Sequence, residues 1–173
     1  VQVYANGGVA SLLAIIFFLK SDPVYIYLFA SSVAAAMSDT WGTEFGKLSR
    51  HKPISITSLK SIDHGISGGI TRIGTLGSLL GSCIIGFSTW MIIPIPTHII
   101  YGIILSGFLS SLFDSILGDM LQGKYKNLNG EIIEVKERDS VLIKGYPWMN
   151  NDLVNLLNTT FSPIILYIFI VLF

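Results

Sequence analysis

The sequence predicts an all-α integral membrane protein, a multi-pass bundle of about five membrane-spanning helices. Of its 173 residues, 51% are hydrophobic and only 13% are charged, whereas a soluble domain has about 25% charged residues. The mean hydropathy is +0.64. Apolar runs of about 20 residues recur along the chain, and this is the length of a helix that crosses the hydrocarbon core.

The apolar runs place five helices at about residues 3–19, 23–41, 66–93, 97–121 and 152–173. Backbone in lipid must satisfy its own hydrogen bonds, so these runs are expected to be helical. We treat residues 1–173 as a single integral membrane domain, in which residues 124–147 form a cytoplasmic loop or hairpin. Because the chain opens without a methionine, we expect it to be a fragment that lacks N-terminal spans.

The basic residues predict the orientation of the helices. Ten of the eleven Lys and Arg residues fall between the second and third runs, at the edge of the third, or between the fourth and fifth. Basic loops stay on the cytoplasmic side, so these connections are expected to be cytoplasmic. The net charge is zero and indicates no nucleic-acid partner.

Four acidic residues fall near the predicted cytoplasmic ends of two spans. Asp39 and Glu44 end the second run, and Asp114 and Asp119 end the fourth. Ionisable residues at membrane depth are unfavourable and generally functional, although a single one can reach the headgroups or pair with a lysine. Within each pair the spacing of five residues is about 140° on a helix, so both acids could face one ion only if the helix bends.

These acids, together with nearby basic and glycine residues, predict a site for phosphate and magnesium. Mg²⁺ is usually held by one or two carboxylates and by substrate phosphates. Lys60 and Arg72 could spread the charge of a transferring phosphoryl group. Gly65, Gly68 and Gly69, at the expected start of the third helix, could hold phosphate oxygens through their backbone. The sequence has no P-loop or HExxH pattern.

Five short segments carry patterns that occur together in a known family. At residues 1–8, 38–47, 65–69, 114–122 and 151–155 the chain reads VQVYANGG, SDTWGTEFGK, GISGG, DSILGDMLQ and NDLVN. In this order they resemble the motifs of the transmembrane protein 19 family, which includes plant and cyanobacterial phytyl-phosphate kinases. Ile66 stands where the family has a threonine, and Asp119 stands where a small residue is expected.

The resemblance implies a membrane kinase that transfers a phosphoryl group from a nucleoside triphosphate such as CTP to an isoprenoid lipid monophosphate. Asp39, Glu44 and Asp114 are then the expected catalytic carboxylates and Mg²⁺ ligands, and Asp119 is a further candidate ligand. The other candidates share a role in binding or neutralising phosphate oxygens; they are Lys60, Arg72, Asn6, Gly65, Gly68, Gly69, Asn151, Asp152 and Asn155.

Two alternatives remain open at the level of sequence. A similar metal site could transfer a cytidylyl instead of a phosphoryl group. Acids at glycine-broken helices also build ion sites in transporters, so a transporter or a lipid-binding membrane protein without catalysis is the rival class. The lipid acceptor, the choice between CTP and ATP, and the oligomeric state are not predicted.

Overall fold

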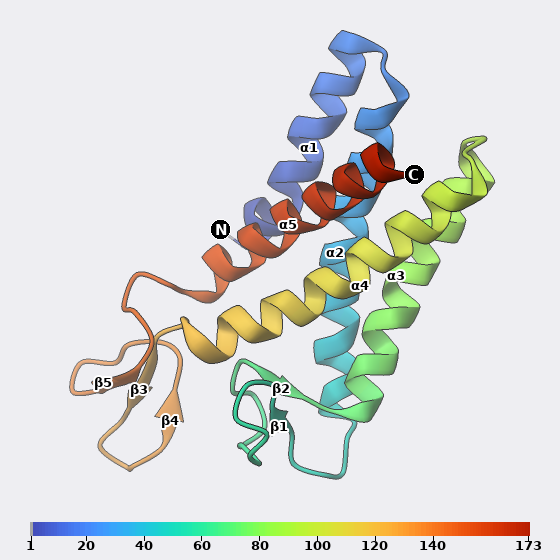
Figure 1. The fold of residues 1–173 in the computed structure, drawn as a ribbon. Coiled ribbons are helices and arrows are strands. Elements are labelled where there is room, and N and C mark those ends of the chain that lie inside the picture. The colour runs from blue at the N-terminus through green and yellow to red at the C-terminus, as the bar shows by residue number, and fades with distance from the viewer. Residues whose placement is uncertain (1) are drawn as a thin grey trace.

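The computed structural model describes residues 2–173, which form an all-α bundle of five long helices with two small sheets at one end (Figure 1). The predicted membrane bundle is confirmed. The helices are α1 (Gln2–Lys20), α2 (Pro23–Lys47), α3 (Arg72–Ile92), α4 (Thr97–Met120) and α5 (Asn151–Leu172). All except α2 have both the length and the hydropathy of a membrane span. Val1, the first residue of the first motif, lies outside the described residues.

Polar side chains fix where three of the helices begin. Asp22 caps α2 by accepting a hydrogen bond from the Val24 amide at 2.9 Å, and a proline occupies the first helical position, where its missing amide is not needed. Thr71 caps α3 through the Gly74 amide at 3.0 Å. Asn150 caps α5 in the same way.

The cap of α3 corrects the predicted start of the third span. The apolar run was expected to be helical from residue 66, but the helix begins at Arg72. Residues 66–71 instead form a turn and the short strand β2 (Gly69–Ile70), which pairs antiparallel with β1 (Ile54–Ser55). The glycines of this segment therefore precede the helix and do not form its first turn.

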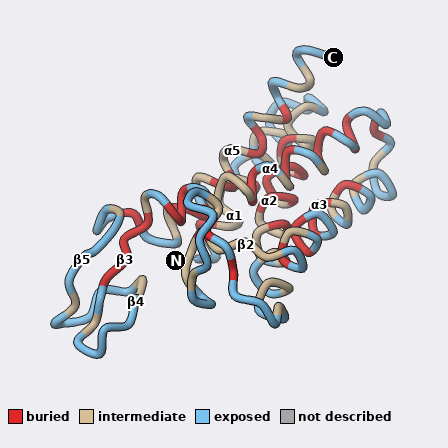
Figure 2. The backbone as a smooth tube through the Cα atoms, turned by 60° about the horizontal axis from the view of Figure 1, so that its bottom comes forward, coloured by how far each residue is buried: buried red, intermediate tan, exposed pale blue. Residues whose placement is uncertain are grey.

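Helix α2 lies at the centre of the bundle and contacts the other four helices. Small residues allow this close packing. A Cβ atom added to Gly107 of α4 would lie 2.8 Å from the Cβ of Ala34, and one added to Gly81 of α3 would lie 2.8 Å from the Met37 carbonyl. Residues on the central face of α2 are buried, whereas residues on the outer faces of the helices are largely exposed (Figure 2).

Serine hydroxyls satisfy one another inside this packed region. Ser31 Oγ lies 3.0 Å from Ser106 Oγ and 2.7 Å from Ser162 Oγ, and thus joins α2 to α4 and α5. Ser32 Oγ donates to the Thr159 carbonyl at 2.9 Å. Buried hydroxyls without partners would be unfavourable in lipid, so these bonds make the small-residue interfaces specific.

The second sheet occupies the predicted hairpin between α4 and α5, which we call the hairpin segment (residues 124–147). It has three strands in the order β4-β3-β5, where β3 is Lys124–Lys126, β4 is Ile132–Ile133 and β5 is Val141–Lys144. A turn at Asn129 and Gly130 connects β3 to β4, and Gly130 has a φ of +84°. Both sheets lie at the same end of the bundle (Figure 1).

The close approach of α2 and α4 can be tested with one methyl group. We expect Gly107→Ala to lower the free energy of unfolding by about 1–3 kcal/mol, because the new methyl overlaps Ala34. Gly8→Ala is the matched control, since a Cβ there meets no atom within 4 Å. Thermal unfolding in detergent measures both variants. Equal melting temperatures for the two would contradict the described packing.

Candidate functional site

A polar cavity of about 430 Å³ lies at the end of the bundle that carries the two sheets. Its walls come from the C-terminal half of α2, the start of α3, the C-terminal half of α4, and residues 64–71, which we call the glycine loop. Ser49 and Pro53 from the connection between α2 and β1, Glu134 of the hairpin segment and Asn151 of α5 complete the lining. Every helix except α1 thus contributes to this cavity.

Two aspartates from different helices meet at the wall of the cavity. The carboxyl groups of Asp39 of α2 and Asp114 of α4 lie within hydrogen-bonding reach of each other. Asp114 Oδ2 is buried without a hydrogen-bond partner, and no Lys or Arg within residues 2–173 forms an ion pair with either aspartate. Adjacent carboxylates repel each other strongly at low dielectric, so a shared proton or a cation is needed to stabilise the pair.

The close packing of α2 against α3 positions Asp39. A Cβ on Gly74 would lie 2.8 Å from the Gly42 carbonyl, so the helices meet through glycine backbone. Ser38 Oγ donates to the Ser78 carbonyl at 2.8 Å and fixes the rotation of α2 about its axis. This contact places Asp39, the next residue, at the cavity.

The glycine loop is positioned by residues that adopt a left-handed backbone. Gly65 and Gly68 each have a φ of +85°, a conformation that favours glycine. A Cβ on Gly68 would lie 2.7 Å from the Asp119 amide nitrogen, so only glycine fits against α4 at that point. Gly65, Gly68 and Gly69 all line the cavity, as residues of a loop and not of a helix N-terminus.

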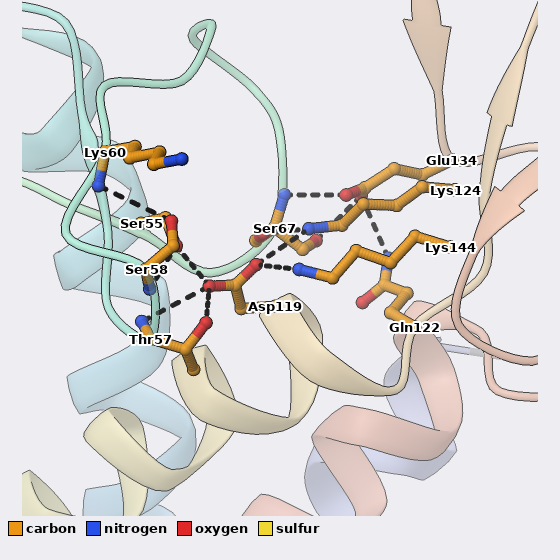
Figure 3. A network of polar contacts seen from close by, with 10 residues as sticks. All are labelled: Ser55, Thr57, Ser58, Lys60, Ser67, Asp119, Gln122, Lys124, Glu134 and Lys144. Atoms are coloured by element: carbon orange, nitrogen blue, oxygen red, sulfur yellow. Dashed lines mark hydrogen bonds and ion pairs between the residues drawn. The ribbon is translucent and has the colours of Figure 1, made fainter.

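Asp119 is the centre of a network of hydrogen bonds and ion pairs that attaches the β1 strand, the loop after it and the hairpin segment to α4 (Figure 3). Its Oδ2 accepts from Ser55 Oγ and Thr57 Oγ1, each at 2.5 Å, and from the Thr57 amide at 3.3 Å. Its Oδ1 pairs with Lys144 at 2.7 Å and with Lys124 at 3.5 Å. Burial lowers the pKa of the Lys124 ammonium, and the Asp119 carboxylate opposes that shift. Asp119 is only 2% exposed.

This network corrects the interpretation of Asp119 as a metal ligand. Both of its oxygens already accept hydrogen bonds, and its side chain is not among those that line the cavity with Asp39 and Asp114. Its five donors come from the β1 strand and loop and from the hairpin segment. Asp119 therefore anchors these two segments to the end of α4.

Glu44 also lies away from the cavity. It forms an ion pair with Lys47 at 2.6 Å, in which both side chains are about 60% exposed. Helix α2 continues without a break to Lys47, so Glu44 stays about 140° from Asp39 around the helix axis. The bend that would bring both acids to one ion is absent from α2.

The structure gathers only some of the other predicted residues. Gly65, Gly68, Gly69 and Asn151 line the cavity with the two aspartates. Asn6 lines a separate groove between α1 and α2, and Asn155 is buried within the bundle. The remaining candidates, which do not line the cavity, are Lys60 and Arg72, both exposed, and Asp152, which is half-buried.

Several cavity residues were not predicted. Gly42, Thr43 and Gly46 line the cavity together with the predicted Asp39. The four residues follow the i, i+3, i+4, i+7 spacing of one helix face, so periodicity counted from Asp39 could have found the other three. Ser111 and Ser115 flank Asp114 at the same kind of spacing. Lys47, at the end of this face of α2, also lines the cavity, and its ammonium is paired with Glu44 at 2.6 Å. Glu134 has no local signal, because only the tertiary fold brings it to the cavity.

The fold and the cavity together define a class, a membrane-embedded helical bundle with a carboxylate pair at one end. Residues 1–162 match the family described as Integral membrane protein DUF92, and the chain belongs to this family. This match, together with two relatives from Arabidopsis thaliana that are described below, confirms the resemblance to the transmembrane protein 19 family.

Curated relatives include proteins of archaea, plants and cyanobacteria. The chain is 34% identical over 123 residues to the uncharacterized membrane protein MJ0933 of Methanocaldococcus jannaschii, covering 71% of this chain and 51% of that protein. It is 30% identical over 148 residues to protein PGR of Arabidopsis thaliana (70% and 51%). It is 27% identical over 140 residues to chloroplastic protein VTE6 of the same plant (79% and 35%).

The chain spans about half the length, or less, of the curated relatives described above. No solved structure matches it.

The anchoring role of Asp119 predicts a local change in amide hydrogen exchange. We expect Asp119→Asn to speed exchange around Thr57 and in β5, because the uncharged amide no longer balances the Lys124 and Lys144 ammonium groups. Asp139→Asn removes an acid of the exposed hairpin segment that forms no ion pair within residues 2–173, and serves as the control. The same exchange pattern in both variants, measured by mass spectrometry, would rule out the anchor.

Proposed function

We propose that this membrane protein is a phosphotransferase that moves the terminal phosphoryl group of a nucleoside triphosphate, such as CTP, to an isoprenoid lipid monophosphate at the cytoplasmic face. The observation that carries the proposal is the half-buried pair of Asp39 and Asp114 on a polar cavity, with one buried Asp114 oxygen lacking a partner. The choice of acceptor is supported by the resemblance to the transmembrane protein 19 family, because that family includes phytyl-phosphate kinases.

The residues of this cavity fit a magnesium ion. Mg²⁺ takes hard oxygen ligands and is usually held by one or two carboxylates together with substrate phosphates. Residues 2–173 contain no cluster of three His, Cys, Asp or Glu side chains suited to a metal, so Asp39 and Asp114 are the two protein ligands that we assign. When bound, the ion would neutralise charge on the nucleotide phosphates.

The rest of the cavity suits the binding of phosphate oxygens. The glycine loop presents backbone without side chains at Gly65, Gly68 and Gly69, which allows close approach of a phosphate. The Lys47 side chain also lines this cavity, and its ammonium would have to leave the exposed pair with Glu44 to offset negative charge that develops during the transfer. Asn151 can donate to a phosphate oxygen from the start of α5.

The chemical step needs positioning more than it needs a base. An oxygen of the acceptor monophosphate attacks the γ-phosphorus of the nucleotide, and the bond from this phosphorus to the β–γ bridging oxygen breaks. A nucleoside diphosphate leaves, and the product is a lipid diphosphate. The acceptor oxygen is already ionised near neutral pH, because the second pKa of a phosphate monoester is about 6, so no side chain has to remove a proton.

The surface of the bundle suits a lipid acceptor. The outer face of α3 exposes Leu76, Leu80 and Phe87, each by at least half, so a prenyl chain could lie against apolar side chains while its phosphate reaches the cavity. Ten of the eleven basic residues lie in or beside the connections at the cavity end, which supports a cytoplasmic orientation of that end.

A lipid kinase assay tests the proposal. Full-length protein in liposomes is given Mg²⁺, γ-labelled CTP or ATP, and prenyl monophosphates beside the matching alcohols. We expect label in a lipid diphosphate, and a fall of about 10²-fold or more in rate for Asp39→Asn and for Asp114→Asn. Asp22→Asn, at the opposite end of α2, keeps a helix-capping side chain and should retain the wild-type rate.

Three other results would each contradict the proposal. Wild-type rates in both aspartate variants would remove the carboxylate pair from the mechanism. Transfer of label from α-labelled CTP to the lipid would establish cytidylyl transfer. A folded protein that neither binds nucleotide nor labels any lipid would favour the transporter or lipid-binding alternative.

A further inference from the structure

The carboxylate of Glu134 accepts hydrogen bonds from donors that lie outside the hairpin segment (Figure 3). Its Oε1 accepts from the Ser67 amide at 2.6 Å, and its Oε2 accepts from Ser67 Oγ at 2.7 Å and from Gln122 Nε2 at 2.9 Å. Ser67 belongs to the glycine loop, and Gln122 follows the C-terminus of α4. A single acid from the hairpin segment thus fills a ring of three donors.

A positive charge completes this ring. Lys124 Nζ donates to the Ser67 carbonyl at 2.7 Å and interacts electrostatically with Glu134. Gln122 and Lys124 are only 2% and 5% exposed, so two members of the ring are held rigidly inside the protein. Three converging N–H and O–H donors with a nearby ammonium form a binding site for an anion.

Glu134 is attached to the protein less firmly than the donors that it meets. It follows β4, a strand of two residues at the edge of the sheet that pairs only with β3. Residues 135–139 after it are all exposed. Segments with few buried contacts open at low free energy, so the Glu134 side chain can leave while Ser67, Gln122 and Lys124 stay in place.

We infer that this ring, formed by Ser67, Gln122 and Lys124, is a phosphate-binding site that Glu134 occupies until a phosphate-bearing substrate displaces it. A phosphate group offers the same kind of oxygen acceptors as the carboxylate, and the ring borders the cavity because Ser67 and Glu134 both line it. The inference rests on the proposed function only for the kind of anion. The part of the hairpin segment that carries Glu134, from β4 to residue 139, then acts as a lid that closes the site when no substrate is bound, while Asp119 keeps Lys124 and Lys144 in place.

A purely structural role for Glu134 makes the opposite prediction. If the carboxylate only fastened the hairpin segment to the glycine loop, its removal would leave the Ser67 and Gln122 donors unpaired and disordered, and anions would bind more weakly. If it competes with phosphate, its removal frees the ring and anions bind more tightly. The direction of the change in affinity therefore separates the two roles.

The test is the binding of labelled inorganic pyrophosphate to full-length protein in detergent, with no lipid and no turnover. We expect Glu134→Ala to raise the affinity about tenfold. If the carboxylate fills the ring about 90% of the time, only about a tenth of the wild-type protein can bind the anion, and removal of the carboxylate frees the rest. Glu137→Ala removes the same charge from an exposed position of the same loop, where the side chain forms no ion pair within the described chain, and should leave the affinity unchanged. Adding Ser67→Ala to Glu134→Ala should reverse most of the gain.

Each result of the pyrophosphate titration either supports or overturns the inference. A gain in Glu134→Ala that is absent in Glu137→Ala and lost with Ser67→Ala supports the inference, even if the lipid kinase assay fails. An equal gain in both glutamate variants would indicate general charge repulsion and would overturn it. Unchanged or weaker binding in Glu134→Ala, in protein whose melting temperature shows that it is folded, would overturn it as well.

Two further titrations assign the source of the phosphate, with CTP and with a short-chain prenyl monophosphate. A gain of Glu134→Ala affinity for the nucleotide alone assigns the ring to the phosphoryl donor. A gain for the prenyl monophosphate alone assigns it to the lipid acceptor. No gain for either ligand would overturn the inference.

Discussion

The approach of two carboxylates inside the bundle is the constraint on which the rest of this structure depends. Asp39 and Asp114 come from different helices and meet because α2, α3 and α4 touch through glycine, alanine and serine. Such a pair is unfavourable at low dielectric unless something neutralises it. The small residues that permit the contact thus do more than fill space, since they hold two like charges together at one wall of a cavity.

The acids near the helix ends divide into two kinds according to their direction. Asp39 and Asp114 face the cavity. Five residues later in each helix, Glu44 pairs with the exposed Lys47 and Asp119 pairs with Lys144 of the hairpin segment. Asp119 binds the β1 region and the hairpin segment to the end of α4. This anchor keeps the glycine loop beside the carboxylate pair, so a residue outside the cavity determines the shape of the cavity.

Much of this arrangement could be predicted from the sequence, and the failures have identifiable causes. Composition and apolar runs predicted the five helices, because helix length and hydropathy in a bilayer follow from its thickness. The start of α3 was predicted six residues early, because hydropathy does not detect the Thr71 cap or the left-handed Gly68 that separate the loop from the helix. Asp39 and Asp114 were found because acids at membrane depth are rare.

The remaining site residues depend on tertiary geometry. Lys60 and Arg72 were selected for their charge alone, and both are exposed away from the cavity. Glu44 and Asp119 were selected as partners in pairs, although a straight helix turns them by about 140° from the first acid. Glu134 meets Ser67 across 67 residues of chain, and no periodic pattern predicts such a contact.

The most direct test of the account is a double-mutant cycle on metal binding. Mn²⁺ can replace Mg²⁺ as a paramagnetic probe, and its binding is measured by electron paramagnetic resonance for the wild type, Asp39→Asn, Asp114→Asn and the double variant. If both carboxylates hold one ion, each single variant loses most of the binding and the double variant loses little more, because the two effects are coupled. Wild-type affinity in either single variant would contradict a shared site, and so would losses that simply add.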